Sequence, residues 1–404
     1  MALLVRKYGG SSLASPKLIE AVARQVVDAA EGGNDVCVVV SAMGDTTDEL
    51  LKLAAAVSPS AQGRELDMLL SSGERISIAL LSMAIDKLGR EAVSFTGSQA
   101  GIVTDARHGR ARIVDVRPER VIEALGAGRI PIVAGFQGRS AELDITTLGR
   151  GGSDMTAVAL AASLGADTCE IFTDVEGVFT ADPRLVRDAR KLPVLSYEEM
   201  LELSACGSKV LMLRSVEVAR NNRVRLHIRS SFTGSEGTWI MEEGMEQAII
   251  SGVAHDDSEA KVTILGVPDR PGVAARVFRP LADAGARVDM IVQNVSADGR
   301  TDVSFTLPEE DVRKVEGVLS TVGEEVGSQG VVVDADVAKV SLVGAGMKSD
   351  VSVVADMFEA LAAAGINIEI ISTSSIRISC VIRAVSLEQA VRVVHDRFGL
   401  AEAP

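Results

Sequence analysis

Short apolar runs alternate with longer segments of helical periodicity through the first part of the chain. The runs are apolar on both faces, as strands of a covered parallel sheet are, and they lie within residues 3–10, 35–44, 129–138 and 168–177. Residues 15–33 predict a helix with Ser15 as its N-cap and Pro16 at its first position, and residues 153–166 predict another. This alternation predicts an α/β sandwich around a mainly parallel sheet, in which ligands bind at the loops that follow the strands.

The last part of the chain contains an internal repeat. Residues 261–296 align with residues 339–374, and each copy continues with a strand and an amphipathic helix. The aligned pairs are Lys261 with Lys339, Gly266 with Gly344, Phe278 with Phe358 and Gly285 with Gly365. Each copy therefore predicts a ferredoxin-like βαββαβ unit of about 70 residues. Two tandem copies behind an enzyme-sized domain favour a regulatory module over a purely structural dimerisation unit.

These patterns predict three domains. A catalytic domain is expected over residues 1–245, and the two repeats are expected over 260–336 and 337–404. The charged stretch 241–247 is the best linker, because it contains a glycine among acidic residues. The strand-like segment 247–255 belongs to neither repeat and is a candidate to complete the sheet of the second.

Composition narrows the class of protein. A net charge of −15 argues against nucleic acid or an anionic membrane as partner, so any phosphate has to be held by a few local cations and backbone N–H groups. The four cysteines lack CxxC spacing, as is typical of reduced thiols in a cytoplasmic protein, and the four scattered histidines argue against a histidine metal site. The N-terminal apolar run is too short for a secretory leader, and no run approaches the ~18 residues of a membrane span. We therefore expect a cytoplasmic protein.

Lys7 closes the first apolar run and is followed by Gly9, Gly10, Ser11 and Ser12. Glycines let the backbone approach a ligand, and a lysine beside a helix N-terminus is a ready phosphate site. An ordinary strand-to-helix turn with a solvent-directed lysine explains the same residues. The motif alone leaves both interpretations open.

The segment 146–154 places Arg150 among three glycines, before Ser153 and Asp154 at the start of a predicted helix. Arginine holds a carboxylate or a phosphoryl group through two hydrogen bonds. Capping explains Ser153 and Asp154, but it requires no arginine flanked by glycine. This segment favours a binding site.

Other polar positions have an ordinary structural explanation beside the functional one. Glu74 follows Ser71 at the spacing of a capping box, which is the better explanation from these residues alone. Ser41, Thr46 and Thr47 are neutral donors after the second strand, and a helix cap explains them equally well. Lys209 is expected at a helix start, where a solvated lysine is usual.

The segment 172–184 follows the apolar residues that begin the run within 168–177, and it carries Asp174, Asp182 and Arg184. A long polar loop of this kind can surround a base and ribose while the arginine reaches phosphate. D-x-x-G and D-P are also common turn sequences, so an ordinary turn is the alternative.

Taken in order, a series of motifs resembles the aspartate kinases over essentially the whole chain: KYGGSS, SAMGDTTDELL, DMLLSSGERIS, SFTGSQAGI, VAGFQG, TTLGRGGSD, FTDVEGVFTADPR and GSKVL. The two repeats resemble tandem ACT domains. The resemblance implies a three-layer α/β/α amino-acid kinase fold with two C-terminal ferredoxin-like ACT domains. It also implies ATP-dependent phosphorylation of the β-carboxylate of L-aspartate to 4-phospho-L-aspartate, the first step of lysine, threonine and methionine biosynthesis.

The resemblance implies a role for each matching residue. Lys7 stabilises the transferring γ-phosphoryl, Asp154 organises Lys7 and the reacting centre, and Arg150 completes the catalytic set. Glu74 takes the ammonium of aspartate and Arg150 its α-carboxylate. The full set implied for aspartate is Thr47, Glu74, Arg150, Gly151, Gly152 and Ser153. The set implied for ATP is Lys7, Tyr8, Gly9, Gly10, Ser41, Thr173, Asp174, Phe179, Thr180, Ala181, Asp182, Pro183, Arg184 and Lys209. Mg²⁺ is expected with ATP, and no residue is assigned as a metal ligand.

The repeats imply feedback regulation by lysine, threonine or both, and a homo-oligomer formed through ACT domains. The effector contacts implied by position are Asp269, Pro271, Gly272, Gln293, Asn294, Asn367, Ile368, Thr373 and Ser374. The second repeat has Asp350, Val351 and Ser352 where a Pro-Gly pair is usual. We therefore expect weaker inhibition by lysine plus threonine than two complete effector loops would produce.

The chain departs from the family pattern at two further positions, and two other functions stay open. Met155 stands where a second Thr or Ser is usual, and Phe179 where Tyr is common. A kinase for another small acid or carbamate is one alternative, against which the Glu74 and Arg150 pair argues. A non-catalytic amino-acid sensor is the other, and a pathway-dedicated, feedback-relaxed aspartate kinase is a variant of the main interpretation.

Overall fold

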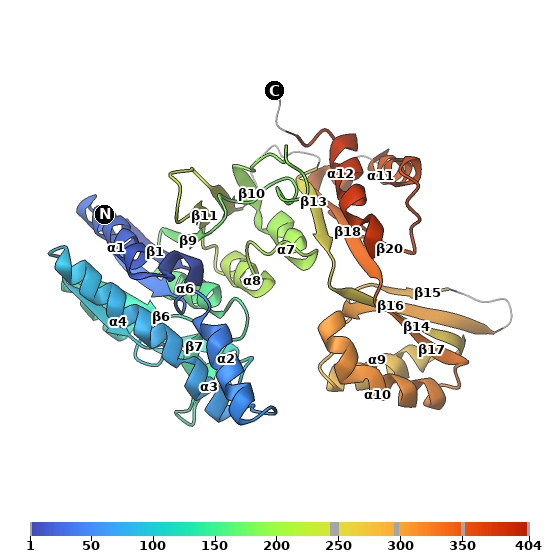
Figure 1. Ribbon diagram of the computed structural model, residues 1–404, viewed down its shortest axis with the longest axis horizontal. Coiled ribbons are helices and arrows are strands. Elements are labelled where there is room, and N and C mark those ends of the chain that lie inside the picture. The colour runs from blue at the N-terminus through green and yellow to red at the C-terminus, as the bar shows by residue number, and fades with distance from the viewer. Residues whose placement is uncertain (1, 243–249, 295–298, 349–351, 402–404) are drawn as a thin grey trace. The chain divides into compact units, whose positions relative to one another are not determined.

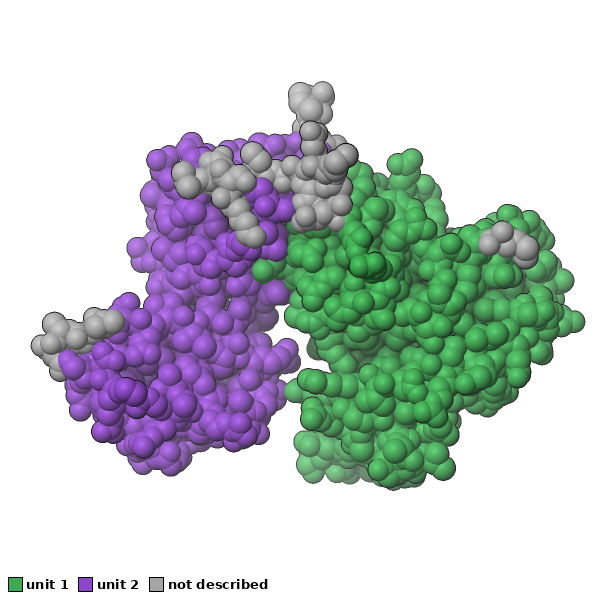
Figure 2. Space-filling model, turned by 180° about the vertical axis from the view of Figure 1, so that it is seen from behind, with its two compact units in different colours: residues 1–178, 191–204, 209–246 green, residues 179–190, 205–208, 247–404 purple. Residues whose placement is uncertain are grey.

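The computed structural model describes residues 2–242, 250–294, 299–348 and 352–401. The chain divides into two compact units, drawn in green and purple in Figure 2. The first comprises residues 1–178, 191–204 and 209–246, and the second comprises residues 179–190, 205–208 and 247–404. We expected a single boundary near residue 245. Two short segments before it, residues 179–190 and 205–208, instead belong to the second unit.

An eight-stranded sheet forms the centre of the first unit (Figure 1), with strand order β10-β12-β11-β9-β1-β2-β6-β3. Every neighbouring pair is parallel except β11 and β12. The four apolar runs identified in the sequence are the adjacent strands β9, β1, β2 and β6, as predicted. The strands are β1 (Leu3–Tyr8), β2 (Asp35–Val40), β3 (Ala92–Phe95), β6 (Ile130–Ala134), β9 (Thr168–Thr173), β10 (Val194–Ser196), β11 (Leu226–Ser230) and β12 (Thr238–Met241).

Helices cover both faces of this sheet. Helices α1 and α4 share one apolar core with β1 and β2 (Figure 1), whereas α6 packs on the same strands and contacts α8. Successive strand residues point to opposite faces, so Tyr8 lies in the core beneath α1 while its neighbour Lys7 faces α6. The helices are α1 (Pro16–Glu31), α2 (Thr46–Val57), α3 (Arg64–Leu70), α4 (Ser72–Lys87), α5 (Glu119–Gly126), α6 (Gly152–Leu164), α7 (Tyr197–Ala205) and α8 (Leu213–Asn221). The expected three-layer α/β/α arrangement is confirmed.

Local signals account for where the first helix begins. The Ser15 side chain accepts a hydrogen bond from the Leu18 N–H, and Pro16 is the first helical residue, as predicted. A short 3₁₀ helix, η1 (Gly10–Leu13), precedes it. The chain therefore turns from β1 into α1 through a compact glycine-containing loop.

A smaller sheet with order β5-β4-β7-β8 lies beside the large one in the first unit. Its strands are β4 (Ile102–Thr104), β5 (Ile113–Val116), β7 (Gln137–Arg139) and β8 (Ile145–Thr147). Strand β8 leads directly into the glycine-rich segment that carries Arg150. The small sheet thus positions one of the loops expected to bind substrate.

Residues 64–87 are long and apolar enough to cross a membrane by length and composition, which the sequence analysis did not expect. In the structure this segment is α3 followed by α4, and α4 packs on α1 and on the large sheet. It carries two buried carboxylates, Asp67 and Glu74. The segment is therefore a core element of the first unit.

Two antiparallel four-stranded sheets form the second unit, one for each sequence repeat. The first has order β15-β16-β14-β17 and the second has order β13-β18-β20-β19. The first repeat comprises β14 (Glu259–Pro268), α9 (Val273–Asp283), β15 (Ile291–Gln293), β16 (Arg300–Pro308), α10 (Glu309–Glu325) and β17 (Gly330–Asp334). The second comprises β18 (Val337–Val343), η2 (Ala345–Lys348), α11 (Ser352–Ala363), β19 (Ile370–Thr373), β20 (Arg377–Arg383), η3 (Ala384–Ser386) and α12 (Leu387–Arg397).

The fourth strand of the second sheet comes from before both repeats. Strand β13 (Gly252–Asp256) pairs antiparallel with β18, the place that β17 takes beside β14 in the first repeat. Residues 247–249 of the strand-like segment lie outside the described residues. Because the second repeat ends in a helix, its sheet takes its last strand from earlier in the chain.

Reciprocal ion pairs join the two repeats. Lys261 of the first repeat pairs with Glu369 of the second, and Lys339 of the second pairs with Asp289 of the first, at 2.6 Å. Lys261 aligns with Lys339, and each acid lies four residues after an aligned glycine. The sequence repeat therefore reappears as an approximate two-fold arrangement of charges. Lys339 is almost completely buried and also pairs with Glu259 at 3.0 Å.

Candidate active site

The carboxyl ends of the central parallel strands meet at one edge of the large sheet. Gly9 N–H donates to the Phe172 carbonyl at 3.2 Å, which joins the loop after β1 to the end of β9. On the other side, Gly135 N–H donates to the Val40 carbonyl at 2.9 Å, which joins the loop after β6 to the end of β2. Loops from four strands are thus brought together, as expected for a ligand site in such a sheet.

Lys7 and Asp154 form an ion pair at this edge, with 2.6 Å between Nζ and Oδ1. Each side chain is only 11% exposed, so the ammonium is largely withdrawn from bulk water. The interpretation of Lys7 as a solvent-directed lysine is therefore wrong. A Cβ atom at Gly9 would lie 3.6 Å from Nζ, so the ammonium lies beside the glycine loop.

Asp154 does not cap its helix. Helix α6 has Gly151 as its N-cap, in the left-handed region at φ 70°, and no side chain caps it by a hydrogen bond. The capping interpretation of Ser153 and Asp154 is therefore wrong. The glycine turn places Asp154 in the first turn of α6, where the Asp154 carboxylate meets Lys7.

Glycines permit backbone contacts here that a side chain would prevent. A Cβ atom at Gly10 would lie 2.9 Å from the Ala42 carbonyl oxygen, and one at Gly135 would lie 2.8 Å from the Cβ of Ser153. Real Cβ atoms essentially never approach so closely. The loops after β1 and β2 therefore pack backbone to backbone, and the loop after β6 lies directly against the first turn of α6.

Glu74 points into the same region from α4. Its side chain is 2% exposed, and Oε1 accepts a hydrogen bond from Ala42 N–H at 3.2 Å. The capping-box interpretation is wrong, because Ser71 has helical dihedral angles and its hydroxyl donates to Met68 O. Burial raises the pKa of Glu74 to about 7. Among the described residues, no hydrogen bond is donated to Oε2, so this oxygen can accept one from a bound cation.

Arg150 lies on an exposed loop between Gly149 and Gly151, which have φ values of 77° and 70°. Left-handed conformations on both sides explain why glycines flank the arginine. The backbone beneath is anchored, because Arg214 donates to the Leu148 carbonyl at 3.2 Å. The structure forms no ion pair to Arg150 within the described residues. Its guanidinium is thus available to an anion.

The residues expected to bind ATP fall into two groups. Lys7, Gly9, Gly10, Ser41, Thr173 and Asp174 lie at the ends of β1, β2 and β9. The Tyr8 side chain is instead a core residue that stacks on Phe172 with ring centroids 4.7 Å apart. Phe179, Thr180, Ala181, Asp182, Pro183 and Arg184 lie in the second unit. The sequence analysis placed both groups in the catalytic domain and did not anticipate this division.

Thr180 is buried in the packing of the second unit. Its hydroxyl lies 3.0 Å from His395 Nε2, donates to the Leu400 carbonyl at 3.1 Å and accepts from Arg190 N–H. Ala181 is buried in the core beside it, and Phe179 packs against the same core. The side chains of Thr180 and Ala181 therefore stabilise the second unit rather than face a ligand.

Asp182 and Arg184 form a local turn, which was the alternative interpretation of this motif. Asp182 accepts from Arg184 N–H at 2.9 Å and pairs with its guanidinium at 2.6 Å. This arginine lowers the pKa of Asp182. Lys209 was expected at a helix start, but it lies exposed in the loop before α8.

The expected effector residues lie in both repeats, and those at the ends of β15 and β19 occupy corresponding places. In the first, Asp269, Pro271 and Gly272 precede α9, which begins at Val273 with Gly272 as N-cap at φ 92°, so Pro271 precedes the helix rather than starting it. Gln293 ends β15, and Asn294 follows it. In the second, Asn367 and Ile368 precede β19, Thr373 ends it and Ser374 follows. Asp350 and Val351 lie outside the described residues, and Ser352 begins α11.

Comparison with known proteins identifies the class and then the family. The model of the amino acid kinase family matches residues 2–230, and two ACT domain models match residues 261–327 and 340–398. The aspartokinases of Corynebacterium glutamicum and Corynebacterium efficiens are 59% and 58% identical to this chain, over 99% of it and 97% of their own length. The chain therefore belongs to the aspartokinase family, as its motifs suggested.

Solved structures agree with this assignment. The aspartate kinase of Synechocystis is 41% identical, covers the whole of this chain over 70% of its own, and has a TM-score of 0.56. E. coli aspartokinase III in complex with aspartate and ADP has a TM-score of 0.85 over 98% of this chain and 99% of its own. At 24% identity the second structure shows the shared fold.

Proposed function

We propose that this protein transfers the γ-phosphoryl group of ATP to the β-carboxylate of L-aspartate, producing 4-phospho-L-aspartate. The main structural support is the Lys7–Asp154 ion pair, which is largely buried and lies among glycine-containing loops at the ends of parallel strands. Aspartokinases that are 58% and 59% identical over nearly the whole chain support the same reaction.

The geometry suits phosphoryl transfer, which depends mainly on positioning and on neutralising spread negative charge. Lys7 stabilises the γ-phosphoryl oxygens, and Asp154 holds Lys7 in place. Glu74 binds the ammonium of aspartate and Arg150 binds its α-carboxylate. The attacking β-carboxylate is already ionised at neutral pH, since an ordinary aspartate side chain has a pKa near ~4, so no general base is required.

ATP brings Mg²⁺ in this proposal. Within the described residues, no cluster of three or more His, Cys, Asp or Glu side chains could hold a metal ion. Mg²⁺ commonly binds one or two carboxylates together with substrate phosphates. The residues therefore fit a magnesium ion carried by the phosphates, which it would partly neutralise.

Regulation and cellular role form the finer part of the proposal. We assign the reaction to the start of lysine, threonine and methionine synthesis in the cytoplasm, with lysine, threonine or both as effectors at the ACT repeats of a homo-oligomer. The regulatory part of this assignment is supported by the two repeats, each of which matches an ACT domain model and forms a four-stranded sheet. E. coli aspartokinase III, which shares the fold, has been crystallised with lysine and aspartate.

A hydroxylamine trap for acyl phosphate tests the reaction directly. Purified protein with aspartate, ATP and Mg²⁺ should form aspartyl hydroxamate, and glutamate or carbamate in place of aspartate should not support product formation. A non-catalytic amino-acid sensor would form no product.

Titration of the activity with lysine and threonine, separately and together, should show weak combined inhibition, because the second effector loop is incomplete. Strong synergistic inhibition at micromolar concentrations would contradict this expectation.

The pKa of Glu74 predicts how aspartate binding depends on pH. Only the ionised carboxylate attracts an ammonium, and burial raises this pKa to about 7. The kcat/KM for aspartate should therefore rise with pH through about 7 and then level off, because kcat/KM reports the free enzyme. Glu74→Gln should raise the KM for aspartate and abolish this rise. A wild-type profile that is flat between pH 6 and 8 would remove Glu74 from the ammonium site.

A further inference from the structure

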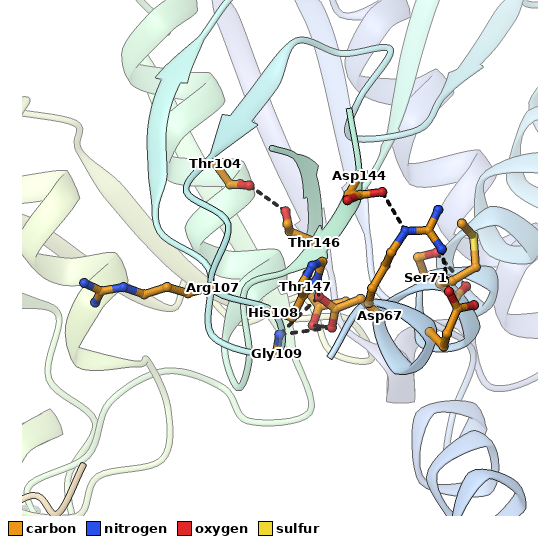
Figure 3. A network of polar contacts seen from close by, with 12 residues as sticks. Asp67, Ser71, Thr104, Arg107, His108, Gly109, Asp144, Thr146 and Thr147 are labelled. Carbon is orange, nitrogen blue, oxygen red and sulfur yellow. Dashed lines mark hydrogen bonds and ion pairs between the residues drawn. The ribbon is translucent and has the colours of Figure 1, made fainter. Parts of the chain in front are cut away.

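Asp67, to which the sequence motifs assign no role, is the centre of a buried hydrogen-bond network (Figure 3). Its side chain is 1% exposed. Thr147 donates to it through its hydroxyl at 2.6 Å and through its N–H at 3.1 Å. Gly109 N–H lies 3.1 Å from both carboxylate oxygens, and His108 Nδ1 lies 2.8 Å from Oδ2. The sequence offers one signal for this residue, an acidic position directly before the apolar run of residues 68–70.

This carboxylate joins three segments that are distant in the sequence. Asp67 lies on α3, Gly109 lies in the loop between β4 and β5, and Thr147 is the last residue of β8. A buried carboxylate is costly unless it is fully hydrogen-bonded, and hydrogen bonds to an ionised acceptor are the stronger ones. The four donors therefore fix the relative positions of the helix and both loops.

The fixed loops lead to Arg150. Thr147 stands three residues before Arg150 in the sequence. Between them, a Cβ atom at Gly149 would lie 3.0 Å from the Gly109 carbonyl oxygen, so the two loops are also in close contact. Asp67 binds both sides of this contact.

The same helix pair leads to Glu74. Helix α3 continues through Ser71 into α4, and Glu74 is in the first turn of α4. Asp67 thus connects the element that carries the proposed ammonium contact to the loop that carries the proposed α-carboxylate contact. These two groups of an amino acid are attached to one carbon atom, so the distance between their binding residues determines which ligands fit.

We propose that Asp67 is a positioning residue that sets the Arg150 loop against the Glu74 helix and thereby determines affinity for the amino-acid substrate. The inference rests on the proposed function, since it takes Arg150 and Glu74 as the aspartate contacts. Asp67 itself contacts no substrate in this proposal. Its effect reaches the substrate through Thr147 and the glycine-flanked loop.

Two neighbouring threonines on β8 provide a matched pair of variants. Thr147→Val removes the hydroxyl that donates to Asp67, whereas Thr146→Val removes one that is bonded to Thr104 Oγ1 at 2.6 Å. Both side chains are buried, and both variants keep the β-branched shape. Thr147→Val should raise the KM for aspartate about tenfold, since small displacements of a binding group are costly, and leave the KM for ATP unchanged. Thr146→Val should lower the thermal midpoint of unfolding about as much as Thr147→Val does, but it should leave the KM for aspartate and the KM for ATP unchanged.

Combination with Arg150→Ala separates positioning from general stability. In that background Thr147→Val should raise the KM for aspartate no further, because the group that it displaces is gone. Equal effects of the two threonine variants, or full additivity with Arg150→Ala, would overturn the proposal. An Arg150→Ala variant with an unchanged KM would instead refute the proposed function of Arg150. Asp67→Asn, whose amide cannot accept at every donor, should reproduce the Thr147→Val result more strongly.

Discussion

Replacing Lys7 with alanine should lower kcat by about 10³-fold, the scale on which loss of a single oriented charge-stabilising donor reduces a rate. Lys7 faces the site from β1 and is held by Asp154 at 2.6 Å. An ammonium in this position stabilises the transition state most, because negative charge spreads over the transferred phosphoryl group there. The measurement is the initial rate of aspartyl hydroxamate formation at saturating ATP and aspartate.

Two controls accompany the Lys7 variant. Lys7→Ala leaves the Asp154 carboxylate without its cation, so Lys7→Ala/Asp154→Asn shows whether lost activity reflects this unpaired charge. Lys17→Ala removes an exposed lysine of α1 and should keep wild-type kcat. Circular dichroism should show that every variant is folded. A folded Lys7→Ala protein with a normal kcat would remove Lys7 from the transition state.

Replacing Arg150 with alanine should raise the KM for aspartate about 30-fold, which corresponds to losing a charge-assisted hydrogen bond worth ~2 kcal/mol. The KM for ATP should change little. The guanidinium is exposed on a loop between two left-handed glycines, so its removal should leave the thermal midpoint unchanged. Steady-state kinetics with each substrate varied in turn measure the effect.

Arg150→Lys tests the geometry of this contact. Lysine keeps the charge but cannot form the paired hydrogen bonds of a guanidinium with a carboxylate, so it should restore only part of the affinity. Arg107→Ala is the matched control, since Arg107 is an exposed arginine on the neighbouring loop. If Arg150→Ala and Arg150→Lys both kept the wild-type KM for aspartate, Arg150 would not bind the α-carboxylate.

The arrangement of the second unit bears on how regulation reaches the reaction. Residues 179–190 carry part of the motif that resembles an ATP loop, yet they belong to the unit that contains the repeats. Thr180 is bonded to His395 on α12 and to the Leu400 carbonyl. A rearrangement of the second repeat would therefore move this segment.

Local signals in the sequence were sufficient for part of the fold and for the motifs from which the site is proposed. Apolar runs and helical periodicity located β1, β2, β6 and β9, and Ser15 with Pro16 marked the start of α1. The repeat and the ordered motifs predicted the fold class and the family. These features depend on neighbouring residues, so they can be recognised without knowing which distant segments meet.

Pairing between distant residues was decided by the tertiary structure alone. Glu74 and Asp154 occupy positions at which a local explanation, capping, was available, but they meet Ala42 and Lys7 instead. Thr180, which belongs to a motif that resembles a kinase loop, lies in the core of the second unit beside His395. Asp67 gains its importance from donors 41 to 80 residues away. Burial and hydrogen bonding across such separations depend on how whole elements pack, and no local pattern of residues encodes that packing.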